Sequence, residues 1–209
     1  ETPAALEPGK TYRVQVPLNH IAQSFPAGNR LRLSLSTSYW PLAWPPPKPV
    51  RLTVHTHTSN LMLPVREPRS NDRLRRPLMH PQGAPPIATT QVEPKNHTWR
   101  VIRDLANEAS TLEVIIDEGT TRFDDIDWTV TNRAKEWYTF QHDDFNTVRG
   151  ETRWERRFER EHWQVKTLTR TVLTSSQTHF NLHASLDAWE NDKRIFSRNW
   201  QHQIPRNCV

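Results

Sequence analysis

The chain has 209 residues and a mass of 24.6 kDa, which is enough for one large domain or two small ones. Its mean hydropathy of −0.82 and short apolar runs exclude a transmembrane helix, which needs about 20 apolar residues. Only 5 glycines stand against 17 prolines, while nine Trp and seven Phe supply large side chains for a core. Cys208 is the single cysteine, which excludes an internal disulfide framework and fits a cytoplasmic protein.

The formal net charge is +5, and it is unevenly distributed. Residues 1–96 carry 12 basic and 5 acidic side chains, whereas residues 97–209 are slightly acidic. The basic residues are scattered, so we expect no nucleic-acid partner. The chain begins with Glu1 and shows no signal peptide, so we expect a processed chain or a piece of a longer one, with no membrane partner.

The dominant period along the chain is two, which is typical of β-strands. In the first part, apolar and polar residues alternate over 12–18, 30–36 and 52–54. Between the last two of these segments, residues 38–47 combine two Trp with four Pro. Proline cannot continue a regular ladder of hydrogen bonds, so we expect an ordered aromatic loop there.

From residue 64 to residue 95 no period holds, and seven prolines occur. This composition predicts a linker or a long surface arm. We therefore place the organisational boundary of the chain in this stretch.

The second part returns to alternation with longer segments, and residues 180–188 are the clearest example. Short polar stretches at 117–119 and 190–192 predict hairpin turns, so neighbouring strands should be antiparallel. Only residues 132–137 and 143–150 resemble helical turns. The sequence predicts a mainly β fold with little helix.

The chain lacks the motifs of several enzyme classes. No Ser has a Gly two residues away on either side, so there is no Gly-x-Ser-x-Gly nucleophile elbow. Glycine-rich phosphate-binding loops are absent as well. We expect no catalytic residue and no cofactor in this chain.

Three weaker patterns have a functional interpretation beside a structural one. His55 and His57 lie on the same side of a predicted strand, which is a spacing of some metal sites, but no third ligand follows at a short distance. The acidic clusters at 124–127 and 142–144 suit calcium or acid–base chemistry, although aspartate is common in turns. The Trp residues suit sugar stacking, although in alternating strands they are more often core.

Several stretches resemble the C-terminal part of the Xaa-Pro dipeptidyl-peptidase-like serine hydrolases, which include cocaine esterase and glutaryl-7-aminocephalosporanic acid acylase-like enzymes. They lie at residues 6–34, 39–66, 142–145 and 180–206. The strand that begins at Gly28 is similar to that of the family, with Asn29 in place of the usual His. Phe145 stands where the family has a proline.

The resemblance implies an organisation in three parts. Residues 1–65 would be the C-terminal strands of a jelly-roll β-sandwich, residues 66–96 a proline-rich arm, and residues 97–209 an antiparallel β-rich extension. The partner that it implies is an upstream α/β-hydrolase domain of the same protein, which carries the catalytic residues, with a homo-oligomer as a further possibility.

Within this reading, Tyr39, Trp40 and Trp44 are the candidates for the surface nearest the substrate entrance or the catalytic domain. The region itself would be non-catalytic, and the parent would cleave ester or amide bonds, including Xaa-Pro peptides. Two alternatives stay open. One is a free-standing β-sandwich that binds glycans or another protein, and the other is a metal-dependent enzyme that uses His55 and His57.

Overall fold

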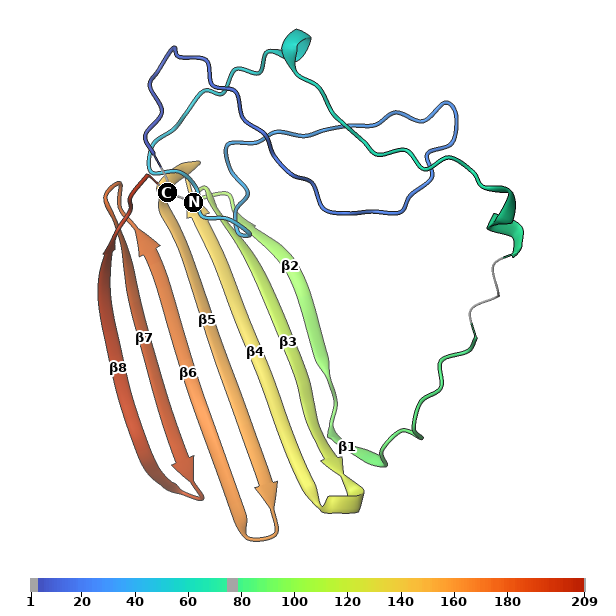
Figure 1. Ribbon diagram of the computed structural model, residues 1–209. Coiled ribbons are helices and arrows are strands. Elements are labelled where there is room, and N and C mark those ends of the chain that lie inside the picture. The colour runs from blue at the N-terminus through green and yellow to red at the C-terminus, as the bar shows by residue number, and fades with distance from the viewer. Residues whose placement is uncertain (1–3, 75–78, 209) are drawn as a thin grey trace.

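The computed structural model describes residues 4–74 and 79–208. It confirms the mainly β, antiparallel fold class: eight strands form a single sheet (Figure 1). Among the described residues, the only helices are short 3₁₀ segments at Thr56–Thr58, Ser70–Leu74 and Asp124–Ile126. No helix in these residues is both long enough and apolar enough to cross a membrane.

The strands occupy the second part of the chain and are mostly long. Their bounds are β1 Thr89–Glu93, β2 Asn96–Asp104, β3 Ala109–Phe123, β4 Trp128–Gln141, β5 Asp144–Arg160, β6 Trp163–Ser175, β7 His179–Glu190 and β8 Lys193–Pro205. From β3 to β8 each strand pairs with the next one in sequence, so this part of the sheet is an antiparallel meander. Each of these strand pairs is connected by a short turn, as expected for antiparallel neighbours, and the strands coincide with alternating segments of the sequence.

One edge of the sheet is built from two strands in line, because β1 and β2 pair with different halves of β3. Pro94, which has no N–H to donate, separates them. Opposite this break β3 has a bulge between Asp117 and Thr120. The bulge contains Gly119, whose φ is +66°, and a Cβ there would lie 2.7 Å from the carbonyl oxygen of Pro94. Only glycine fits this approach.

The tight turns use left-handed backbone without glycine. His142 and Asp143 join β4 to β5 with φ values of 51° and 52°, and Asn191 begins the β7–β8 turn with φ 51°. Positive φ in two-residue turns matches the twist of the flanking strands. The hairpin predicted at 190–192 is therefore confirmed.

Three local predictions in the second part are wrong. Residues 117–119 lie inside β3 as a bulge and do not form a hairpin, because β3 continues past them to pair with β1. Residues 132–137 lie in β4, and residues 144–150 begin β5, so neither stretch is helical. Pairing with a neighbouring strand on both sides outweighs the local composition there.

The two faces of the sheet differ in chemistry. One cross-strand row consists of Ile116, Ala134, Trp154, Thr169 and Leu186. We call the side that carries this row the apolar face. The neighbouring residues along each strand point to the opposite side, which we call the charged face because Arg and Glu alternate on it.

The first part of the chain does not join the sheet. Among the described residues before Thr89 there is no strand, so the strands predicted over 12–18, 30–36 and 52–54 are not formed. Their apolar residues are exposed, as Val14 (78%) and Leu33 (57%) show. Alternation alone does not hold a strand, which needs backbone hydrogen bonds to a neighbouring strand. In Figure 1 these residues form open loops beyond one end of the sheet.

Candidate functional site

The aromatic loop at residues 38–47 packs against one end of the sheet through its side chains. The rings of Trp40 and Trp44 meet edge to face with centroids 4.8 Å apart. Trp40 then meets Tyr138 of β4 at 5.8 Å, and Trp44 meets Phe180 of β7 at 5.7 Å, again edge to face. These separations and angles are those of favourable aromatic pairs. We call the contact formed by Trp40, Trp44, Tyr138 and Phe180 the aromatic clamp.

Polar contacts fix the clamp. The indole N–H of Trp44 donates to Ser175 Oγ at 2.8 Å. The guanidinium of Arg206 donates to the carbonyl oxygen of the buried Pro45 at 2.5 Å and lies 4.7 Å from the ring centroid of Phe180. Burial lowers the pKa of Arg206 from its ordinary value. The clamp therefore joins residues that are more than 130 positions apart in the sequence.

Tyr138 is a donor in this contact region. Its hydroxyl donates to Glu136 Oε2 at 2.7 Å. Burial first, and then the hydrogen bond to Glu136, raises the pKa of Tyr138 to about 12. Because the phenol stays protonated at neutral pH, its ring packs against Trp40 without a charge.

A cavity of about 230 Å³ lies between the aromatic loop and the β4–β5 hairpin, and we call it the end cavity. Its lining residues are Ser38, Trp40, Pro45, Phe140, Asp143, Asp144, Phe145 and Val148. Pro45 and Val148 are buried, and the two aspartates are exposed at the rim. The indole N–H of Trp40 is buried and has no hydrogen-bond partner in the described part of the chain.

The three candidate residues of this loop are therefore placed differently. Trp40 and Trp44 lie together against the end of the sheet. Tyr39 points away and is 67% exposed, and it is held by a bridge to Ala43, whose N–H donates to its carbonyl oxygen at 2.8 Å. Arg206 ends the last stretch that resembles the family, but no role was predicted for it, and Ser175 was not singled out from the sequence.

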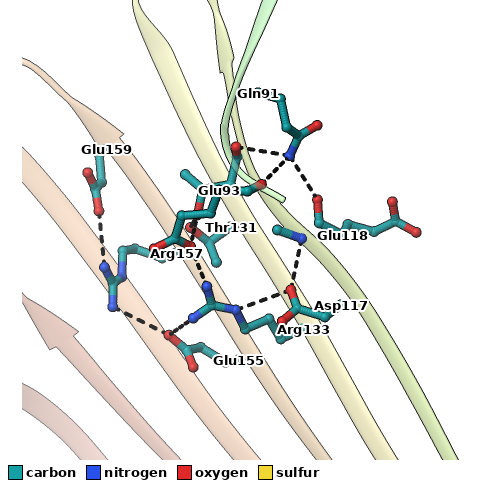
Figure 2. Close-up of polar contacts among 11 residues, drawn as sticks. Gln91, Glu93, Asp117, Glu118, Thr131, Arg133, Glu155, Arg157 and Glu159 are labelled. Carbon is teal, nitrogen blue, oxygen red and sulfur yellow. Dashed lines mark hydrogen bonds and ion pairs between the residues drawn. The ribbon is translucent and has the colours of Figure 1, made fainter. Parts of the chain in front are cut away.

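The charged face carries a network of ion pairs centred on Arg133 of β4 (Figure 2). Its guanidinium contacts Glu93 of β1, lies 3.2 Å from Asp117 Oδ1 of β3 and 3.9 Å from Glu155 Oε1 of β5. Thr120, which donates to Glu93 Oε2 at 2.6 Å, lowers the pKa of Glu93, and the charge of Arg133 adds to this effect. The network thus ties the short β1 to the sheet.

A second cluster on the same face is centred on Glu151 of β5, whose side chain is only 6% exposed. Arg170 and Arg153 each donate to its Oε1 at 2.7 Å, and Arg149 donates to its other oxygen. Hydrogen bonds from these arginines, that of Arg170 foremost, lower the pKa of Glu151 to about 2. The three arginines share this one carboxylate, so the cluster ties β5 to β6 and keeps an excess of positive charge on this face.

The residues considered for metal binding do not form a site. Among the described residues, no group of three or more His, Cys, Asp or Glu side chains is placed to hold a metal ion. The rings of His55 and His57 meet edge to face at 6.1 Å at the exposed 3₁₀ turn Thr56–Thr58, and the strand predicted for them is not formed. Asp124 accepts a hydrogen bond from Thr90, and Asp144 accepts one from Asn146, as turn residues do.

Comparison with known proteins bears on the first part of the chain. The family model of the X-Pro dipeptidyl-peptidase C-terminal non-catalytic domain matches residues 1–101. The match includes the aromatic loop and ends within β2, and it confirms the resemblance to this family over these residues. No curated protein and no solved structure shows a significant match to the chain.

Proposed function

From the match of residues 1–101 to the X-Pro dipeptidyl-peptidase C-terminal non-catalytic domain, we propose that the chain is the non-catalytic C-terminal β region of such a hydrolase. The parent hydrolyses ester or amide bonds, X-Pro peptide bonds among them, with a nucleophile in an α/β-hydrolase domain. The role of this region is to pack on that domain and to shape substrate access or assembly.

The observation that carries this proposal is the exposure of the family-matched segments. Leu31, Leu33 and Leu35 alternate with polar residues and are 53%, 57% and 59% exposed. A segment that forms a strand only beside a partner is left exposed when that partner is absent. Such partners are what the remainder of a jelly roll supplies, and residues 1–65 would then be its last strands.

The exposed surface of the whole chain supports the same proposal. The structure exposes 18113 Å². A compact monomer of this mass exposes about 10,000 Å². The excess is several times the area that each partner buries in a standard interface, about 800 Å². Packing against a further domain would cover part of this excess.

The aromatic loop has a specific place in this proposal. Trp40 and Trp44 hold the loop on the extension at residues 97–209, and the exposed ring of Tyr39 is left for the catalytic domain or the substrate entrance. A cytoplasmic location fits the free thiol of Cys208.

The test is labelling with a fluorophosphonate probe together with turnover of a chromogenic ester. We expect the 209-residue chain to show neither, and the parent enzyme to show both. Deletion of the 209 residues from the parent should reduce its stability or its turnover of X-Pro substrates. Stoichiometric labelling of a serine in the isolated chain, or a deletion without effect, would contradict the proposal.

A second candidate is a free-standing module that binds glycans or a protein. It is favoured by two tryptophans on the apolar face, Trp99 and Trp163, which are 78% and 42% exposed. Exposed indole faces stack on sugar rings. Saturable binding of an oligosaccharide that is lost in Trp163→Ala would favour this candidate over the first.

A further inference from the structure

The end cavity has walls of a distinct chemistry. Three of its lining residues are aromatic, namely Trp40, Phe140 and Phe145. Two more, Asp143 and Asp144, carry carboxylates, and none of the lining residues is Lys or Arg. An enclosure of aromatic rings and carboxylates attracts organic cations, because the ring faces and the carboxylates are both negative.

The two carboxylates have no cation of their own. Neither Asp143 nor Asp144 forms an ion pair with a described residue, although the chain carries 28 Lys and Arg. Asp144 accepts hydrogen bonds from the backbone N–H and the side chain of Asn146, which are neutral donors. On the charged face, by contrast, carboxylates such as Glu151 are paired with arginine.

One buried donor beside the cavity is not part of its wall. The indole N–H of Trp40 is buried without an acceptor in the described part of the chain. An unpaired buried donor costs free energy, and the nearby Trp44 donates its own N–H to Ser175. Because this N–H has almost no accessible surface, it does not face the cavity, which therefore offers ring faces and negative charge for a cation.

We propose that the end cavity binds a compact organic ammonium group. The ammonium lies between the aromatic rings and the carboxylates of Asp143 and Asp144. The volume of about 230 Å³ suits a small head group. This site is independent of the proposed catalytic parent.

The ligand would also connect the two parts of the chain. Ser38, Trp40 and Pro45 of the lining belong to the aromatic loop, whereas Phe140 and Phe145 belong to the β4–β5 hairpin. A ligand that contacts both parts binds only when the loop is seated on the sheet. Binding should therefore stabilise the seated loop by mass action.

The probe is choline, which carries a quaternary ammonium and a hydroxyl, and its control is the neutral carbon isostere 3,3-dimethylbutan-1-ol. Isothermal titration calorimetry on the 209-residue chain should show saturable binding of choline and binding of the isostere at least about tenfold weaker. Choline should also raise the melting temperature of the chain. Absence of saturable heat, or equal binding of the isostere, would overturn the proposal.

Variants locate the site. The double change Asp143→Asn and Asp144→Asn should weaken choline about tenfold, and asparagine tolerates the left-handed backbone at position 143. Phe145→Leu should weaken it as well. Asp192→Asn, an exposed carboxylate in the β7–β8 turn, is the matched control and should leave binding unchanged. If the aspartate variants keep a wild-type circular dichroism spectrum and still bind choline fully, the site is elsewhere and the proposal is wrong.

Discussion

At the scale of single residues, the most constrained position is Gly119 in the bulge of β3. Replacement by alanine places a Cβ against the carbonyl groups of Glu93 and Pro94 and strains a backbone with φ +66°. We expect Gly119→Ala to lower the free energy of unfolding by about 3 kcal/mol in urea titrations. Gly83→Ala is the control, because nothing lies within 4 Å of a Cβ there. Equal midpoints for the two variants would contradict this interpretation.

Glu151 makes a prediction about acid stability. Its carboxylate is charged in the folded state down to about pH 2, whereas the ordinary pKa is 4.5. Its stabilisation is therefore fully present above pH 4.5 and is lost as the pH falls toward 2. Glu151→Gln should have a free energy of unfolding lower by on the order of 3 kcal/mol at neutral pH. Its stability should also change less between pH 4.5 and 2 than that of the wild type.

The check is the urea midpoint of both proteins at several pH values. Glu190→Gln changes an exposed carboxylate at the end of β7 and serves as the control. If Glu151→Gln has the same acid dependence as the wild type, the arginines around Glu151 do not stabilise the fold.

At the scale of elements, the aromatic clamp is the contact to test. Trp40→Ala and Trp44→Ala should each lower the free energy of unfolding by about 2 kcal/mol. This is less than the loss for a fully buried Trp, because both rings are half-buried. In the double variant, hydrogen exchange should show loss of protection at Ala43, whose N–H is bonded within the loop. Trp99→Ala on β2 removes an indole that is 78% exposed and should change stability by less than about 0.5 kcal/mol. Unchanged exchange in the double variant would show that the loop is held by other contacts.

The same elements show what the sequence reveals and what it does not. Residues 180–188 alternate and lie in β7, whose two partners are the strands just before and just after it in the chain. Residues 12–18 alternate equally well, yet they have no neighbour and form no strand. Alternation indicates that a segment would have one apolar face as a strand. Whether the strand forms depends on a neighbouring strand that can pair with it. The aromatic clamp could not be predicted from the sequence for another reason. Trp44 and Ser175 are 131 residues apart, and no local pattern relates them.

At the scale of the whole molecule, the large exposed area predicts an extended particle. A compact chain of this length has a radius of gyration of about 17 Å. With 18113 Å² exposed, the 209-residue chain should give a clearly larger value in small-angle X-ray scattering. It should also bind a dye for apolar surface, and dye binding should decrease when the chain is joined to its proposed catalytic domain. A radius near 17 Å for the isolated chain would mean that its first part folds onto the sheet unaided.

The bond between Arg206 and Pro45 also has a consequence for biosynthesis. The meander from β3 to β8 is built from neighbours in sequence, so its hairpins can close one after another as the nascent chain leaves the ribosome. Pro45 emerges early, but its partner Arg206 lies 161 residues later. The aromatic loop therefore cannot complete its contacts with the sheet until the last strand has been synthesised. During this interval the nascent chain exposes the most apolar surface to a chaperone.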